Sequence, residues 1–275
     1  MIPLTPPTVL RRFAKAILPP ALIDLIRGRP LLSQPQFTWQ GIYSHLRDVP
    51  THNSDYDDPQ EVQKHVAWTR AALNEFHSGR QPHLWHEPLG IIAASLAAET
   101  GLVRILDFGG GVGSGFVHLL ATLPNRSLVE YHNVDLPHMC EAGRNLFKLD
   151  DRIAFYTHIP AVRSRCDIVY ANSVLQYVED YKGLLHDLAS LNARYILLAR
   201  LAAGSFPTYA TKQLNLRGKV LPYWFLNFDE LVSILARAGY RLAYHGLAHE
   251  VFDQSNFPKT HRVGRMRNVL FVRSA

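Results

Sequence analysis

Short apolar runs and longer amphipathic stretches alternate along the chain from residue 103 onward. Apolar runs rich in β-branched residues predict buried strands, and an apolar residue at every third or fourth position predicts a helix. The predicted strands lie at 103–107, 128–134, 152–156, 166–171, 194–199, 240–247 and 267–273. Helices are predicted between them at 113–122, 137–149, 179–190 and 227–238. Strands that alternate with helices form a mainly parallel sheet with right-handed crossovers, so the pattern predicts a doubly wound α/β fold with a seven-stranded sheet.

The first hundred residues follow a different pattern. The elements expected there are short amphipathic helices at 8–18 and 20–27, an irregular track at 30–58, and longer helices at 59–77 and 86–100. The acid Asp58 before Pro59 is a helix start signal. We expect residues 1–100 to form an N-terminal helical cap or lid and residues 101–275 to form the main domain. Within that domain, residues 201–226 interrupt the alternation of strands and helices, and we interpret them as an insert rich in aromatic residues.

The composition favours a large folded core, with positive charge at both ends of the chain. Of the 275 residues, 47% are hydrophobic and 19% are charged, which argues against global disorder. The net charge of +6 gathers in residues 1–36 and from Lys259 onward. Basic ends can attract nucleic acid, but they are more often solvated surface. We therefore expect no nucleic-acid partner and favour a homodimer contact for the N-terminal helices.

The sequence contains no recognisable membrane span, signal peptide or metal-binding motif. There is no run of 18 apolar residues and no signal-peptide pattern at the start, so we expect a cytoplasmic protein without a membrane span. Cys140 and Cys166 offer neither a metal spacing nor a disulfide framework. His86-Glu87 does not continue as a zinc motif, because Gly90 stands where the second histidine is needed. We expect no metal site.

A glycine-rich loop follows the first strand of the main domain. Its spacing is Asp107-x-Gly109-x-Gly111-x-Gly113. The dinucleotide fingerprint would need glycine at 114, where Ser114 stands, and the phosphate-binding Gly-Lys-Ser/Thr is absent. Residues without a Cβ let the backbone approach a nucleoside, at the strand edge where open α/β sheets bind ligands. The loop predicts a nucleoside site, with a ligand-free turn as the alternative.

Asp135 ends the second strand, 22 residues after Gly113. A carboxylate there can accept hydrogen bonds from both hydroxyls of a ribose. It could also cap the helix that begins at Pro137, and the two roles are compatible.

These motifs together resemble class I S-adenosylmethionine-dependent methyltransferases. The loop resembles their motif I, and Asn133-Val134-Asp135, Asp167-Ile168-Val169 and Asn172-Ser173-Val174-Leu175 follow in the same order over 103–200. The resemblance implies a Rossmann-like fold and S-adenosylmethionine as cofactor. It implies cofactor binding by Asp107, Phe108, Gly109, Gly111, Gly113, Asp135, Leu136, Asn172 and Ser173. Asp107 would lie under the methionyl end, where a carboxylate favours the ammonium group.

A narrower resemblance covers most of residues 37–248. Its motifs are Phe37-x-Trp39-x-Gly41-x-Tyr43, Leu106-Asp107-Phe108-Gly109-Gly110-Gly111, Ser173-Val174-Leu175-Gln176-Tyr177, Gln213, Pro222-x-Trp224 and Asn227. They are similar to a bacterial methyltransferase family that includes azetidine-2-carboxylate synthases, which make S-adenosylmethionine attack itself.

Gln176, in the segment after the fourth strand, limits which acceptor groups the site could activate. Many O-methyltransferases carry a histidine base where this chain has Gln176, and glutamine takes no proton at neutral pH. Methyl transfer to an amine needs less base strength, as does cyclisation of the cofactor by its own amine. The candidate catalytic residues are Asn172, Gln176, Tyr177, Tyr223 and Trp224. A cage for the sulfonium could consist of Tyr177, Tyr209, Tyr223, Trp224 and Phe225, although aromatic residues in such a loop often only pack.

Three functions follow from these observations. The first is transfer of methyl to a small-molecule acceptor, in secondary metabolism. The second is cyclisation of S-adenosylmethionine to azetidine-2-carboxylate with release of methylthioadenosine. The third is a nucleic-acid-binding protein that keeps only the fold, for which the interleaved basic and aromatic pattern is weak.

Overall fold

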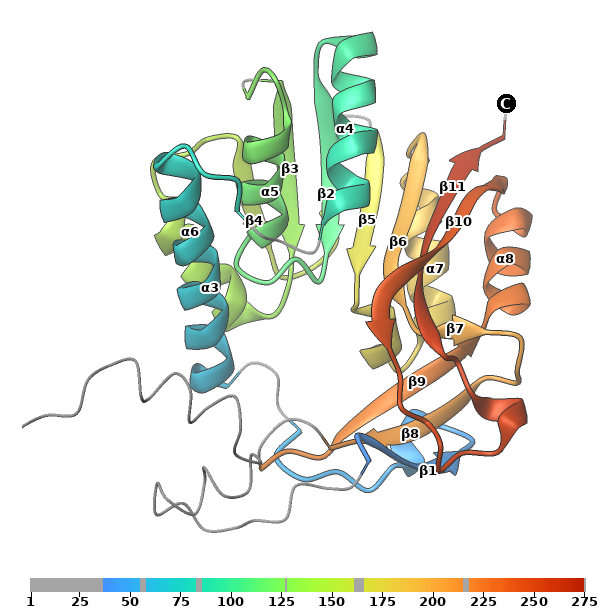
Figure 1. Cartoon of the computed structure of the whole chain (residues 1–275). Coiled ribbons are helices and arrows are strands. Elements are labelled where there is room, and N and C mark those ends of the chain that lie inside the picture. Colours follow the sequence, from blue (N-terminus) through green and yellow to red (C-terminus); the bar gives the residue numbers. More distant parts are fainter. Residues whose placement is uncertain are drawn as a thin grey trace, which may run out of the picture. The chain divides into compact units, whose positions relative to one another are not determined.

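The computed structural model describes residues 37–54, 58–82, 86–126, 128–160, 166–214 and 218–274 (Figure 1). The helices predicted at 8–18 and 20–27, and the dimer contact expected of them, lie outside the described residues. Residues 37–275 form one compact unit. No described helix has both the length and the hydropathy needed to cross a bilayer. The cytoplasmic location stays a prediction.

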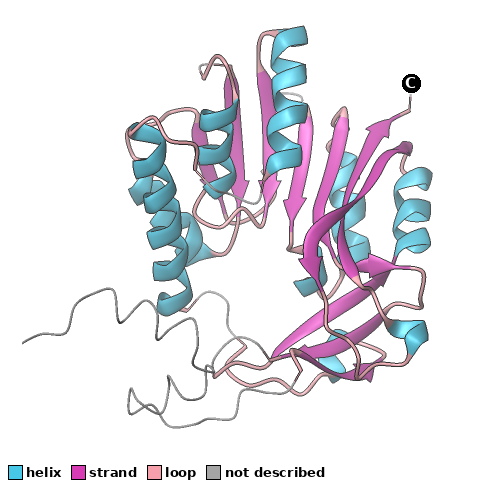
Figure 2. Cartoon of the chain, in the orientation of Figure 1, coloured by secondary structure: helices cyan, strands magenta, loops and turns pink. Residues whose placement is uncertain are grey.

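Seven strands form the main sheet, in the order β10-β11-β6-β5-β2-β3-β4 (Figures 1 and 2). The parallel strands are β2 (Val103–Phe108), β3 (Val129–Val134), β4 (Ile153–Tyr156), β5 (Ile168–Asn172) and β6 (Tyr195–Leu201). Strand β11 (Arg265–Arg273) runs antiparallel to β6, and β10 (Tyr240–Val251) runs antiparallel to β11. The predicted mainly parallel, seven-stranded, doubly wound sheet is confirmed.

Helices cover both faces of this sheet, which is why most side chains of its central strands are buried. The helices are α3 (Pro59–His77), α4 (Glu87–Thr100), α5 (Ser114–Thr122), α6 (Pro137–Leu146), α7 (Tyr181–Ser190) and α8 (Phe228–Arg237). Helices α3 to α6 share one core cluster with β2 and β3, and α7 and α8 share another with β5 and β6. The predicted start of α3 is correct, because the Asp58 side chain accepts from the Gln60 and Glu61 N–H groups.

A second, four-stranded sheet was not predicted. Its order is β1 (Trp39–Tyr43), β8 (Tyr209–Gln213), β9 (Leu221–Asn227) and β7 (Ala203–Gly204). The irregular track expected at 30–58 is thus wrong for β1, and part of the aromatic insert at 201–226 is an antiparallel pair. Because β1 pairs with a strand far along the chain, it leaves no local signal.

The described part of the predicted N-terminal cap packs directly onto the main sheet and its helices. Helix α3 contacts α5 and α6, α4 contacts α5 and β2, and β1 pairs with β8. That residues 1–100 act as a lid stays a prediction.

Candidate functional site

The glycine loop joins β2 to α5 at the carboxyl edge of the sheet. Gly109, Gly111 and Gly113 have φ angles of 76°, 59° and 94°, a region that strains any residue with a side chain. Gly113 also precedes the first residue of α5, whose start has no side-chain cap. The glycines of the loop carry no side chains, and no capping side chain accepts from the N–H groups of the first helical turn.

Three polar side chains support the loop from below. The carboxyl of Asp107 is 1% exposed, and its Oδ2 accepts from the Tyr131 hydroxyl at 2.5 Å. Asn133 Nδ2 donates to the Gly111 carbonyl at 2.9 Å. Asp107 Oδ1 is buried and has no hydrogen-bond partner among the described residues. A buried carboxylate oxygen of this kind calls for a donor, and a bound cationic group would supply one.

Burial raises the pKa of Asp107 to about 7, and the nearby Asp135 charge adds to the effect, while the Tyr131 hydroxyl opposes it. The folded protein therefore keeps a proton that the unfolded chain releases from about pH 4 upward. The stability contributed by this group is complete below about pH 4 and is lost as the pH rises to about 7.

We expect the free energy of unfolding of the wild type, relative to Asp107→Asn, to fall by about 1–3 kcal/mol between pH 4 and pH 8. Urea unfolding of both proteins at the two pH values measures this difference. The comparison isolates Asp107 from other titrating groups, because those are common to both proteins. Parallel pH profiles for the two proteins would contradict the assignment.

Asp135 lies at the end of β3, next to the loop. Its Oδ2 accepts from the Gly111 N–H at 2.6 Å and its Oδ1 from the Leu136 N–H at 2.7 Å. Helix α6 has Leu136 as its N-cap, so Asp135 does not cap it as the alternative interpretation held. Leu136 is 43% exposed and forms an apolar surface beside the carboxylate. The site thus offers a carboxylate for a diol and an apolar side chain for a flat ring.

His65 also lies in this region, although no sequence motif predicts it there. Its imidazole Nδ1 lies 3.2 Å from the position of a Cβ placed on Gly111. Burial lowers the pKa of His65, while the charges of Asp135 and Glu61 oppose the shift. Helix α3 brings the ring there because it packs against α5 and α6. No local motif could have placed a residue of α3 beside the loop.

Asn172 and Ser173 lie at the end of β5, the neighbour of β2 on the other side. Asn172 Nδ2 lies 3.1 Å from His86 Nδ1, which is also 2.9 Å from the Tyr170 hydroxyl. His86 Nε2 is 3.0 Å from Ser114 Oγ. The histidine therefore links the end of β5 to the first residue of α5. The sequence around His86 bears only on a possible zinc motif, so it does not predict the position of this histidine beside Asn172.

Burial lowers the pKa of His86 to about 3, helped by the neighbouring His118 and Arg200. The ring is therefore neutral at physiological pH and cannot serve as a strong base. The His86 and His118 ring centroids are 5.9 Å apart. Within the described part of the chain, no group of three or more His, Cys, Asp or Glu residues is arranged to hold a metal ion.

Gln176 is fully buried beyond the end of β5. Its Nε2 donates to Ser173 Oγ at 3.0 Å and to the Arg200 carbonyl at 3.4 Å. Burial raises the pKa of the Tyr223 hydroxyl well above its usual value, and the Gln176 side chain opposes this shift. The Tyr177 hydroxyl donates to Gln213 Oε1 at 3.0 Å, and the Tyr177 and Tyr223 rings meet edge to face at 5.0 Å. Gln176 thus connects the strand end with the aromatic residues.

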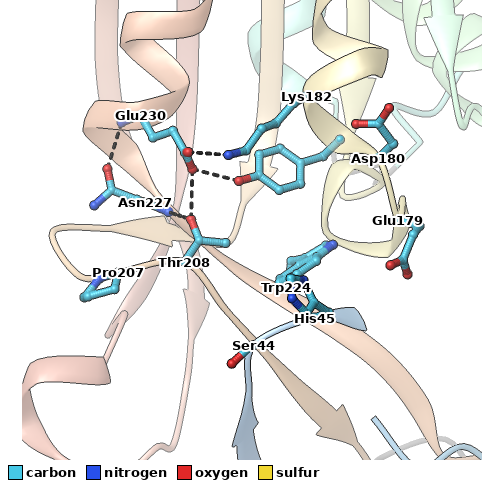
Figure 3. A pocket seen from close by; sticks show the side chains of 11 residues that line it. Ser44, His45, Glu179, Asp180, Lys182, Pro207, Thr208, Trp224, Asn227 and Glu230 are labelled. Atoms are coloured by element: carbon cyan, nitrogen blue, oxygen red, sulfur yellow. Dashed lines mark hydrogen bonds and ion pairs between the residues drawn. The ribbon is translucent and has the colours of Figure 1, made fainter. Parts of the chain in front are cut away.

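The structure separates Trp224 from the other aromatic residues proposed for the cage. Tyr223 and Phe225 point to one face of β9 and pack with Tyr209. Trp224 points to the opposite face, because side chains alternate along a strand, and its Nε1 donates to the Val178 carbonyl at 3.1 Å. Trp224 instead lines a cleft of about 500 Å³ (Figure 3). A single five-ring cage therefore does not form.

The remaining predicted cofactor residues come together as expected of neighbouring strands. Strands β5, β2 and β3 lie side by side, so the loop after β2 begins between the strand ends that carry Asn172 and Asp135, and it contacts Asp135. Phe108 is the last residue of β2, and Gly109 lies against the Val174 side chain. Their roles toward a cofactor stay predictions.

The model of a family described as the methyltransferase domain matches residues 61–245, more than half of the chain. The chain belongs to this methyltransferase family. The match begins in α3 and ends in β10, so it includes the glycine loop, Asp135 and the residues beyond β5.

Several solved structures are similar to this methyltransferase. Magnesium protoporphyrin IX methyltransferase from Synechocystis PCC 6803 is 20% identical, with a TM-score of 0.46 over 69% of this chain and 83% of that one. A 1,6-didemethyltoxoflavin-N1-methyltransferase from Burkholderia thailandensis is 16% identical, with a TM-score of 0.49 over 79% and 91%. An amino pentose methyltransferase from Micromonospora echinaspora is 14% identical, with a TM-score of 0.46 over 70% and 92%. No curated protein matches the methyltransferase in sequence.

Proposed function

We propose that the protein transfers a methyl group from S-adenosylmethionine to a small-molecule acceptor. The observation that carries the proposal is the loop of three left-handed glycines, whose Gly111 N–H is held by the Asp135 carboxylate at the adjacent strand end. A backbone without side chains suits a close-packed nucleoside, and the carboxylate suits its ribose. When bound, S-adenosylmethionine supplies a methyl group on a sulfonium leaving group.

The residues of the site would divide the binding between them. Asp135 would accept the ribose hydroxyls, and Leu136 would pack against the adenine. Asp107 has a buried oxygen without a described partner, which fits a role toward the cofactor's ammonium group. Gly109, Gly111 and Gly113 would let the backbone approach, because a Cβ on each would either strain the loop or meet a neighbouring side chain.

An amine is the acceptor group that the site favours. Gln176 takes no proton, and His86 has a pKa of about 3, so neither removes a proton at neutral pH. An amine in its neutral form attacks through its own lone pair and gives up its proton to water afterwards. Asn172, Gln176 and Tyr177 would then orient the acceptor, and their contribution would be alignment.

Cyclisation of S-adenosylmethionine to azetidine-2-carboxylate is the second candidate. It is favoured by the same lack of a base, because the attacking group would be the cofactor's own amine. It is disfavoured by the packing of the aromatic residues, since Tyr209, Tyr223 and Phe225 are each 2% exposed or less and contact one another. Rings packed in this way leave little face for a sulfonium.

Product analysis separates the two reactions. The purified protein is incubated with S-adenosylmethionine, alone and with a panel of small-molecule amines, and the products are identified by mass spectrometry. We expect S-adenosylhomocysteine only when an acceptor is present, and methylthioadenosine at the level of the enzyme-free control. Methylthioadenosine well above that control, formed without an acceptor, would overturn methyl transfer in favour of cyclisation.

A further inference from the structure

Arg200 occupies an irregular position at the carboxyl end of β6. The register between β6 and β11 shifts at this point, and Arg200 has a φ of 48°. A left-handed conformation is costly for a residue with a long side chain, and such residues cluster at binding sites. A bulge in a strand also redirects its side chain. The fold has therefore given Arg200 a direction that a regular strand would not provide.

Contacts from two other elements hold the bulge in place. The Arg200 N–H donates to Asn268 Oδ1 at 3.0 Å, and the Arg200 carbonyl accepts from Gln176 Nε2 at 3.4 Å. Gln176 belongs to the segment that follows β5, so the bulge is connected to the strand end that carries Asn172. The positive charge of Arg200 also contributes to the low pKa of His86. Arg200 thus lies beside Gln176, one of the residues proposed above to orient the acceptor.

The guanidinium of Arg200 forms an ion pair with the carboxylate of Glu250. Glu250 is brought there by a second irregularity, a register shift between Leu247 and Val251 of β10. Both side chains keep part of their surface open, at 28% for Arg200 and 24% for Glu250. Two strand irregularities therefore converge on one pair of charges.

This ion pair faces a cavity of about 120 Å³. The cavity is lined by Pro88, Arg200, Leu247, Ala248, His249, Glu250 and Asn268. Pockets that enclose a whole small molecule usually measure roughly 300–1,000 Å³, so this one suits a single functional group of a few heavy atoms. Asn268 uses its amide oxygen on the Arg200 N–H, which makes its amide nitrogen the donor end. Arg200 and Asn268 thus offer donors to the cavity, and Glu250 is the one carboxylate among the described residues that line it.

We propose that Arg200 recognises an oxyanion, a carboxylate or a phosphate, on the methyl acceptor, and that Glu250 orients the guanidinium and weakens the binding of free anions. A guanidinium matches such a group through two parallel N–H···O bonds. The Glu250 carboxylate repels a free anion, which makes no other contact with the protein. An anionic acceptor that makes further contacts can offset this repulsion and bind well. That the anion belongs to an acceptor rests on the proposed methyl transfer, whereas the anion site itself does not.

Opposite effects of two variants test the site. The thermal unfolding midpoint of the full-length protein is followed against acetate and against inorganic phosphate, with sodium chloride as the reference at equal ionic strength. We expect Arg200→Gln to raise at least about tenfold the anion concentration that is needed for a given rise in the unfolding midpoint. We expect Glu250→Gln to lower that concentration about tenfold. Arg241→Gln, the same charge change at an exposed residue of β10, should respond as the wild type does.

The outcomes are separable. A response to acetate alone assigns a carboxylate, and a response to phosphate alone assigns a phosphate. An unchanged response in Arg200→Gln, or no response to either anion in Glu250→Gln, would overturn the proposal. If Arg200→Gln does not fold, Arg200→Lys and Glu250→Gln carry the test. Binding of S-adenosylhomocysteine is measured on the same wild-type sample, and its absence would overturn the proposed function without touching the anion result.

Discussion

Asp135→Asn is expected to weaken S-adenosylmethionine binding roughly 10- to 100-fold. The substitution keeps one oxygen that can accept from the Gly111 N–H, as Oδ2 does at 2.6 Å, but it removes the charge and the second acceptor. The ribose would then lose a charge-assisted pair of hydrogen bonds. Isothermal titration calorimetry measures the change directly.

The matched control for this variant is Asp151→Asn. Asp151 is an exposed carboxylate between α6 and β4, so its replacement removes the same charge without touching the loop. We expect its affinity for the cofactor to equal that of the wild type. If Asp135→Asn binds as tightly as the control, Asp135 does not bind the ribose.

Gly110→Ala is expected to abolish measurable cofactor binding and to destabilise the fold by about 1–3 kcal/mol. A Cβ on Gly110 would overlap Asn133 Oδ1 and Asp107 Oδ2, which belong to two of the three side chains that support the loop. Neither can move freely, because Asn133 also holds the Gly111 carbonyl and Asp107 holds the Tyr131 hydroxyl. The loop backbone must therefore move away from Asn133 and Asp107, and this displacement changes the surface that would contact the nucleoside.

Gly79→Ala separates the effect on binding from the effect on stability. Gly79 has a φ of 75° and nothing within 4 Å of an added Cβ, so alanine there adds only backbone strain. We expect a loss of about 1 kcal/mol in the free energy of unfolding and unchanged affinity. Thermal unfolding and calorimetry are measured on both variants. Wild-type affinity in Gly110→Ala would show that the loop is not the cofactor site.

The main sheet could be predicted from the sequence because its strands are buried on both faces. Most residues of β2, β3 and β5 are buried, and these strands were placed within about two residues of their ends. The helix starts at Pro59 and Phe228 were predicted from Asp58 and Asn227, whose side chains accept from the first helical N–H groups. Local chemistry was sufficient for these elements.

Other features depend on contacts between distant parts of the chain. His65 reaches the glycine loop because α3 packs against α5 and α6, His86 reaches Asn172 from the start of α4, and a strand bulge sets the direction of Arg200. None of these placements has a local sequence motif. The separation of Trp224 from Tyr223 was readable in principle, since neighbours in a strand point to opposite faces. It was missed because the insert was not recognised as containing a strand.

Titration of S-adenosylhomocysteine into the full-length protein tests the central claim most directly, because it asks only whether the glycine loop is a nucleoside site. We predict saturable binding to one site per chain with a dissociation constant of about 1–100 µM, weakened by Asp135→Asn but not by Asp151→Asn. The absence of binding at about 1 mM ligand, or equal binding by all three proteins, would contradict the account.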